Sequence, residues 1–331
     1  MNFLSIIRKL GDARWLASIV MGTVLGLAVL VAILRWAGIE DVWRHLWSVD
    51  FFYLSLYFQL NVAIYLLRAW RFRLLLQQKI PLTTLYGVVS VHTLMINLLP
   101  ASAGEISYPF LLKHYGISHR FTDGVPSIVA ARFQDLVVST FLLLGALIWT
   151  GNFNVIIQIM RGSSVAVVAI IIAIAFFFVL VRRFANKIFT LFGRFLMEIL
   201  VSLRDLGLGI WCLSFLCAII IRLIAIIGVC CLIRATHVSL PLPTVILVSS
   251  LYIFLPLLPV NTLAGLGISE GFLMLFFVGS GMQKHLATAA GVQIHLLQLL
   301  IAAFLAVVGI VLLQHKRGLA MASSQEVSLR P

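Results

Sequence analysis

Charge is scarce in this sequence. Only 11% of the 331 residues are charged, and just 11 residues are Asp or Glu. A soluble domain is nearer a quarter charged and half apolar, whereas 62% of this chain is hydrophobic. One water-soluble core cannot hide this apolar surplus. Lipid must therefore be the solvent for much of the surface.

Groups that carry metal or covalent chemistry are also sparse. The four cysteines lie in one apolar run without metal-ligand spacing, and the eight histidines form no HExxH pair. The sequence contains no ATP-binding loop either. We therefore expect no metal, no cofactor and no set of catalytic residues, and we expect any transport to be passive or ion-coupled.

The charge that is present is mostly positive, with a formal net charge of +13. It alternates with apolar runs of about 20 residues, the length of a membrane span. This pattern indicates membrane topology and contact with anionic lipid headgroups, and it does not indicate nucleic-acid binding. The long apolar runs lie at 16–34, 51–67, 82–99, 125–149, 164–181, 207–233, 243–259 and 286–313, with a shorter one at 266–279.

Basic segments predict the orientation of these runs. They lie at the N-terminus, at Arg68–Lys79, at Arg182–Arg204 and in the tail at Lys316 and Arg317. The positive-inside rule places all four in the cytoplasm. Three long apolar runs lie between Lys79 and Arg182, and three lie after Arg204. In each set two runs can cross fully, and the third must turn back. The best candidates for turning back are 82–99 and 243–259, because proline and glycine break both runs.

The sequence thus predicts an all-α, polytopic inner-membrane protein with both termini in the cytoplasm. It has about six full transmembrane helices and two re-entrant helical hairpins. Residues 16–149 and 164–313 form an inverted-topology repeat within a single membrane domain, 1–331. Glu105 and Glu270 follow the two breaks and are 165 residues apart (270 − 105). The residues that break the helices are Pro100, Gly104, Pro259, Gly265 and Gly267.

Five ionisable residues fall within the predicted membrane layer: Glu105, Arg132, Asp135, Arg222 and Glu270. Each costs about 2.5–3.5 kcal/mol on insertion scales unless it is paired or faces water, so each is a candidate functional residue. Either glutamate could instead cap the helix that follows its break. Arg132 and Asp135 stand three residues apart, so they share a helix face and can pair.

Arg132 and Arg222 are the best candidates for contacting a phosphate, because a guanidinium donates a planar fork of hydrogens. Arg222 stands alone in its run, so we expect it to meet Glu270, Asp135, Glu105 or a lipid phosphate in a cavity near the bilayer midplane. Arg132 and the two breaks would line the same cavity. Four further residues could contact a headgroup, although snorkelling or the satisfaction of broken helices explains them equally well. They are Arg68, Arg71, Asn97 and Asn261.

Four segments also carry a family resemblance. In order, they are Arg68–Arg73, Asn97–Glu105, Arg132–Asp135 and Pro259–Gly271. The set resembles the lysylphosphatidylglycerol synthase transmembrane-domain family, also called flippase-like, over roughly residues 15–315. The resemblance implies an integral membrane protein associated with flipping or transferring lipids. Its best-known members carry a cytosolic aminoacyl-transferase domain, for which we expect no room here. The family often has an acid just before the arginine of the third segment, where this chain has Ala131.

Three functions remain open from the sequence. The first is a lipid flippase or transporter for an anionic or polyprenyl-phosphate lipid. The second is a membrane enzyme acting on a lipid headgroup, for which Glu105 with Asp135 or Glu270 is the only conceivable acid–base set. The third is a non-catalytic partner of a lipid or glycan biosynthetic complex.

Overall fold

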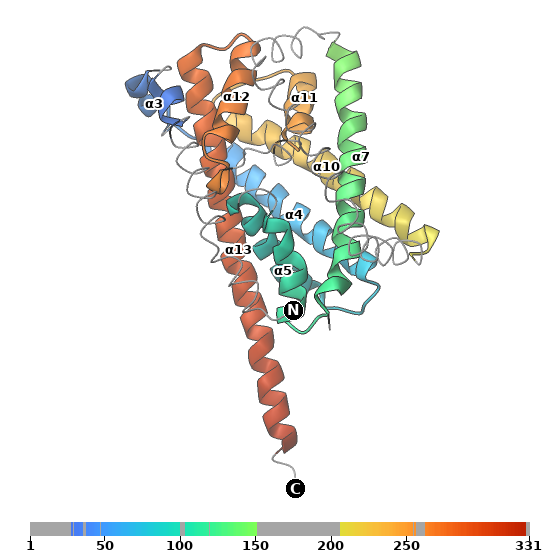
Figure 1. Cartoon of the computed structure of the whole chain (residues 1–331). Helices are drawn as coiled ribbons and strands as arrows, with labels where there is room; N and C mark the ends of the chain where they lie inside the picture. Colours follow the sequence, from blue (N-terminus) through green and yellow to red (C-terminus); the bar gives the residue numbers. More distant parts are fainter. Residues whose placement is uncertain are drawn as a thin grey trace, which may run out of the picture.

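The computed structural model describes residues 28, 30–35, 38–46, 48–99, 103–118, 120–150, 206–253, 255 and 262–328. Within these ranges, all regular structure is helical (Figure 1). Two of the expected spans, 16–34 and 164–181, lie largely or wholly outside the described residues, as do Pro100, Pro259 and Asn261.

In the part of the chain that the structure describes, four helices are long and apolar enough to cross a membrane: α4 (Phe51–Leu76), α7 (Val125–Thr150), α10 (Leu208–Ala235) and α13 (Lys284–Ser328). They coincide with the runs at 51–67, 125–149, 207–233 and 286–313. Local chemistry sets their ends. Asp50 caps α4 by accepting from the backbone N–H of Phe52 at 2.9 Å, and Gln77 ends it in the left-handed conformation (φ 52°).

The remaining helices are shorter. α5 (Leu82–Leu98) is followed by the 3-10 turn η1 (Ala103–Ile106) and by α6 (Ser107–His114). η2 (Phe121–Gly124) precedes α7. α11 (Leu242–Tyr252) is followed by η4 (Leu263–Gly265) and α12 (Ile268–Gly279), and α3 (Ile39–Leu46) packs against α13. The runs at 82–99 and 243–259 therefore give short helices that end at the breaks expected from the sequence.

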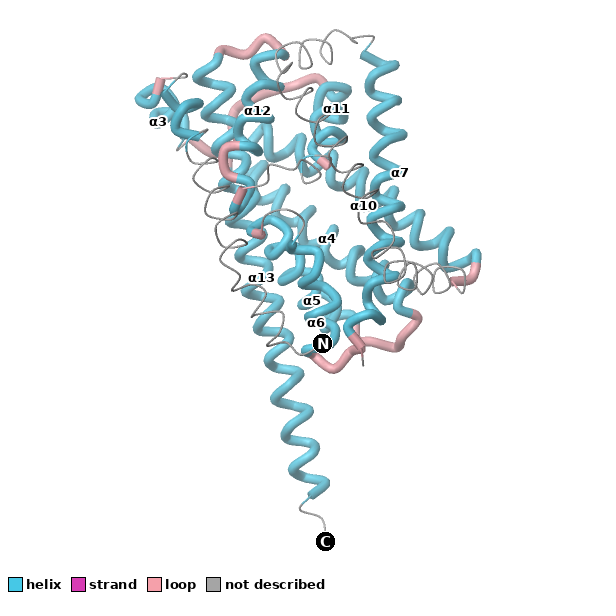
Figure 2. Tube along the Cα trace, viewed as in Figure 1, coloured by secondary structure: helices cyan, strands magenta, loops and turns pink. Residues whose placement is uncertain are grey.

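Helices of the first half of the chain pack against helices of the second half. α4 crosses α10, α5 packs against α13, and α11 packs against α7. In Figure 1, α5 lies in the lower part of the molecule, and α11 and α12 lie in the upper part. Figure 2 shows loops at both ends of the bundle, with the connection after α6 at the lower end.

Glycines allow α5 and α13 to approach closely. A Cβ on Gly87 would lie 2.8 Å from the carbonyl oxygen of Gly309, and a Cβ on Gly309 would lie 2.8 Å from the Cβ of Ser90. Small residues at such contacts are how helices associate in lipid, where apolar side chains gain little from leaving the solvent.

Each pair of short helices contributes to its own hydrophobic core. One core is built around α5 and α6, with Leu85, Tyr108 and Leu112 fully buried. The other is built around α11 and α12, with Val248 and Phe277 buried. The outer faces of the long helices carry exposed large apolar side chains, as expected for a surface solvated by lipid. Examples are Phe141, Ile148, Leu216, Ile227, Phe304 and Val311.

Candidate functional site

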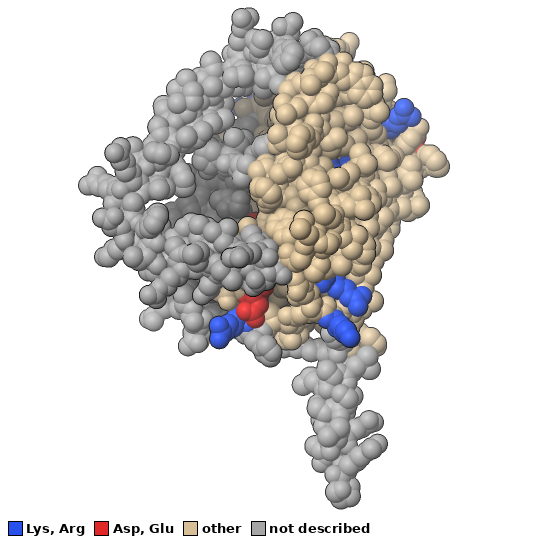
Figure 3. Space-filling view, turned by 90° about the vertical axis from the view of Figure 1, so that its right-hand side faces the viewer, with Lys and Arg blue, Asp and Glu red and all other residues tan. Residues whose placement is uncertain are grey.

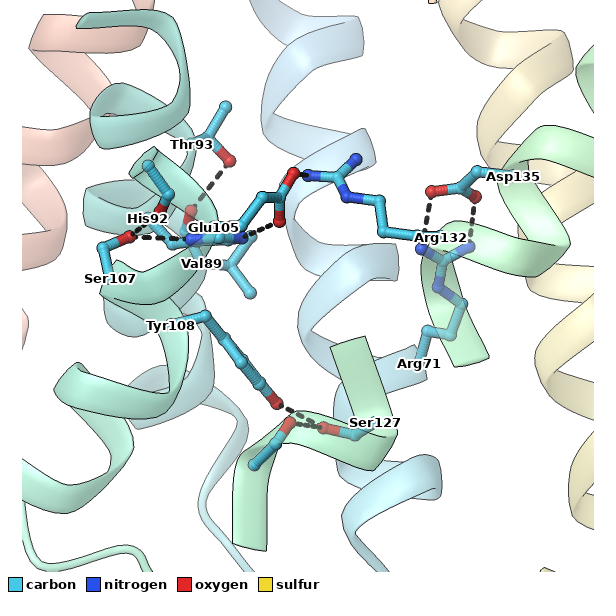
Figure 4. Close-up of polar contacts among 12 residues, drawn as sticks. Arg71, Val89, His92, Thr93, Glu105, Ser107, Tyr108, Ser127, Arg132 and Asp135 are labelled. Atoms are coloured by element: carbon cyan, nitrogen blue, oxygen red, sulfur yellow. Dashed lines mark hydrogen bonds and ion pairs between the residues drawn. The ribbon is translucent and has the colours of Figure 1, made fainter. Parts of the chain in front are cut away.

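The first break, between α5 and α6, holds Glu105 against α7. The Oε1 atom of Glu105 lies 2.6 Å from Nη2 of Arg132, and its Oε2 atom lies 3.7 Å from Nε2 of His92 (Figure 4). The other ring nitrogen of His92 lies 2.8 Å from the hydroxyl of Ser107, which donates to the carbonyl of Gly104. Glu105 and Arg132 are partly exposed, at 32% and 43%.

Gly104 fits this break because it packs directly on the backbone of α5. A Cβ at this position would meet the Cα of Ile96 and lie 2.6 Å from its backbone nitrogen. Backbone atoms cannot move aside as a flexible side chain can, so no larger residue fits without shifting the break. Gly104 therefore fixes the position of Glu105 relative to α5.

A second ion pair joins α4 to α7. Arg71 donates to both carboxylate oxygens of Asp135, at 2.6 and 3.0 Å (Figure 4). The side chains are 2% and 17% exposed. The sequence allows Arg132 and Asp135 to pair with each other, and this expectation is wrong. Each finds a partner on another element, because a partner facing the helix offers better geometry than a neighbour along it.

The second break, between α11 and α12, uses left-handed backbone. Ala264, Gly265 and Gly267 have φ values of 54°, 67° and 79°. Glu270 follows in the first turn of α12 and accepts from the backbone N–H of Gly267 at 2.7 Å. Its other oxygen lies 2.7 Å from Nδ1 of His295 on α13, and both side chains are at most 5% exposed. Glu270 is thus both a helix cap and a partner of His295.

A cavity of about 290 Å³ lies where these elements meet. Arg132, Asn97 and Gly265 line it, so the cavity touches α7 and both breaks. Arg68 lines it as well, and among the described residues it makes no hydrogen bond or ion pair. The other polar residues lining the cavity are Tyr57, Asn61, Tyr65, Thr93, Tyr252, Thr262, Ser269, His295 and Gln298.

Arg222 does not line this cavity. It donates through Nη2 to the backbone carbonyl of Ser249, near the end of α11. Among the described residues Arg222 thus meets a backbone carbonyl in place of the expected carboxylate, and its contact with a lipid phosphate stays a prediction. A carbonyl freed near a helix end can also accept a hydrogen bond from a guanidinium, although it carries no charge, and a sequence pattern cannot reveal it. Arg71 is likewise engaged with Asp135 and does not line this cavity.

Two histidines were missed by sequence reasoning, and one of them had a usable signal. His295 follows Glu270 by 25 residues (295 − 270), and Arg132 follows Glu105 by 27 (132 − 105). In each half of the chain, a basic residue on the long helix after the break contacts the glutamate of that break. His92 has no comparable counterpart, so only the structure identifies its contact with Glu105.

Long apolar helices, two interrupted helical segments and a polar cavity between them define a polytopic α-helical membrane protein. Residues 23–306 match the family model for the lysylphosphatidylglycerol synthase TM region. The chain therefore belongs to this family, and it is a membrane protein related to lipid handling. Comparisons with curated proteins and with solved structures give no match.

Proposed function

We propose that the chain is a lipid transporter that binds a phosphate-bearing headgroup in the central cavity. The observation that carries this proposal is Arg68, a half-buried cation that lines the cavity and makes no hydrogen bond or ion pair among the described residues. Asp135, whose charge acts on Arg68, is already paired with Arg71. A charge in such a place is costly unless a counter-ion or water meets it. A lipid phosphate supplies the missing charge and accepts the guanidinium fork.

Arg132 is the second phosphate contact. It lines the same cavity and pairs with the carboxylate of Glu105, which shows that its guanidinium can bind an anion there. Both members of this pair are partly exposed, and a guanidinium has five donors, so Arg132 can donate to an incoming phosphate while it stays paired with Glu105. The cavity is near the small end of ligand pockets, which run to roughly 300–1,000 Å³. It holds a headgroup, and the acyl chains remain in the bilayer.

An inverted repeat of residues 16–149 and 164–313 accounts for the position of this cavity. Three observations support it. If α4, α5 and α7 correspond to α10, α11 and α13, the contact of α5 with α13 corresponds to the contact of α11 with α7, and the contact of α4 with α10 corresponds to itself. Each half has a glutamate at its break paired to a basic residue 27 or 25 positions later. The broken segments also lie toward opposite ends of the molecule (Figure 1).

We further propose six crossings with the hairpins α5–α6 and α11–α12 entering from opposite sides. Lys79 and Arg120 lie in the connections before α5 and after α6, and basic side chains gather at the lower end of the molecule in Figure 3. The positive-inside rule makes this end cytoplasmic, together with both termini, in an inner membrane. In a cysteine-free background, Lys113→Cys should then be labelled from the cytoplasmic side and Gln283→Cys from the opposite side. Labelling of both from one side would contradict the two hairpins.

Transport is a better account of the carboxylates than headgroup catalysis. Glu105, Asp135 and Glu270 are each engaged by a different basic residue, and none of the three lines the central cavity. General acid–base chemistry requires two such groups beside one reacting atom.

Reconstituted vesicles test the proposal. The purified chain should accelerate movement of a fluorescently labelled phosphatidylglycerol between leaflets, and Arg68→Gln should slow it to near the rate of empty vesicles. Arg73→Gln is the matched control, because Arg73 is an exposed arginine near the end of the same helix. Equal rates for wild type and Arg68→Gln would contradict the assignment of Arg68, and no acceleration by wild type would contradict transport.

A further inference from the structure

The charges that line the central cavity also indicate which kind of group is attached to the phosphate. None of the described residues lining the cavity is Asp or Glu, whereas two are arginines and one is a histidine. Glu105 balances Arg132, and Asp135, whose charge also acts on Arg68, is already balanced by Arg71. The described lining therefore has one uncompensated positive charge.

From this balance we infer that the cavity selects lipids whose phosphodiester bears an uncharged, hydroxylated headgroup, and that it excludes headgroups carrying an ammonium. The inference rests on the proposed function and narrows its substrate class. A phosphodiester brings one negative charge, which neutralises Arg68. A zwitterionic or aminoacylated headgroup would bring an ammonium into a site where no described carboxylate meets it, and unpaired buried charges discriminate strongly between ligands.

The remaining polar groups favour hydroxyls. Asn61, Thr93, Tyr252 and Gln298 line the cavity as neutral donors and acceptors. Such groups match a glycerol or sugar hydroxyl, which also donates and accepts. They cannot replace a carboxylate as a partner for an ammonium, because a buried ammonium needs a counter-charge.

His295 adds a polar ring nitrogen to this set. Its Nδ1 atom lies 2.7 Å from Glu270, so we assign a ring hydrogen to Nδ1. Its Nε2 atom is left as a further hydrogen-bonding group on a residue that lines the cavity. Glu270 is 2% exposed and already meets both His295 and Gly267, so it is not available to bind an ammonium.

A competition experiment on the purified full-length chain tests this inference. The chain in detergent is offered an equimolar mixture of phosphatidylglycerol, phosphatidylethanolamine and lysyl-phosphatidylglycerol, and the bound lipids are quantified by mass spectrometry. We expect phosphatidylglycerol to be enriched about tenfold over each of the other two. Equal binding of all three overturns the inference and leaves the proposed function standing. Binding of none overturns the proposed function itself.

Two further arms sharpen the result. Gln298→Glu places a carboxylate in the cavity and should shift the bound ratio toward phosphatidylethanolamine, whereas Gln314→Glu makes the same change on an exposed face of α13. Identical ratios in these two variants count against the inference.

Excess water-soluble glycerophosphoglycerol separates the sources of the ligand. If phosphatidylglycerol stays bound in the presence of the soluble diester, the ligand is a lipid. If the soluble diester binds and no lipid does, the inference of a lipid ligand is overturned.

Discussion

The buried pair between Arg71 and Asp135 should be tested first, because it positions the cavity wall. Arg68 stands three residues before Arg71 on α4, and Arg132 stands three residues before Asp135 on α7. Residues three apart share a helix face. The two hydrogen bonds between Arg71 and Asp135 therefore hold both cavity arginines at the junction of these helices.

The magnitude follows from the burial of the pair. With side-chain exposures of 2% and 17%, removal of one partner leaves the other charge almost without water. Breaking a buried pair in this way costs about 3–5 kcal/mol. Arg71→Met and Asp135→Leu should each lower the free energy of unfolding by about that amount. The double variant should recover most of the loss, because it removes both charges and replaces them with apolar volume.

Thermal unfolding in detergent, followed by size-exclusion chromatography, measures these changes. Arg73→Met is the matched control, because Arg73 is exposed and near the end of the same helix, and it should change stability little. A double variant no more stable than either single variant would refute the reasoning. The recovered double variant should still bind phosphatidylglycerol, since Arg68 and Arg132 remain in place. Loss of lipid binding in a stable double variant would show that Arg71 or Asp135 contacts the lipid directly.

Three further substitutions probe the breaks and the helix contacts. Gly104→Ala should destabilise the fold by about 1–3 kcal/mol in the same unfolding assay, because its Cβ meets the backbone of α5, whereas Gly145→Ala should be tolerated because its Cβ meets nothing within 4 Å. Gly309→Leu should be more damaging, because even a Cβ there would lie 2.8 Å from a side chain of α5. Glu270→Gln should retain the fold but slow vesicle transport, because Gln keeps an acceptor for the cap and removes the charge beside His295. Normal transport by this variant would leave Glu270 as a cap alone.

The helical elements were readable from the sequence because each depends on local chemistry. Apolar length predicted α4, α7, α10 and α13, and α5 and α11 end shortly before the prolines that were expected to break their runs. The presence of polar residues at the breaks was readable for the same reason. Glu105 and Glu270 occupy the turns that follow the breaks, where freed backbone N–H groups favour a negative side chain.

The partners of the charged residues were not readable, because they depend on how helices cross. Arg71 was interpreted as a headgroup contact or a snorkelling residue, yet both of its terminal nitrogens donate to Asp135 on α7. Arg222 was assigned to a phosphate or a carboxylate, yet its partner is a backbone carbonyl. A guanidinium has five donors on a long stem, so it reaches any acceptor on a neighbouring helix, and sequence spacing constrains that choice weakly.

The proposed internal repeat would restore part of the missing information. If the two halves share one fold, a contact in one half predicts its counterpart in the other. Applied to the sequence, the step of 27 residues from Glu105 to Arg132 directs attention to the region of α13 about as far beyond Glu270, where His295 lies. The substitution of histidine for arginine then has a chemical consequence. The first half presents a permanent cation to the cavity, and the second half presents a group that can be neutral, so the two sides of the site can recognise different parts of one headgroup.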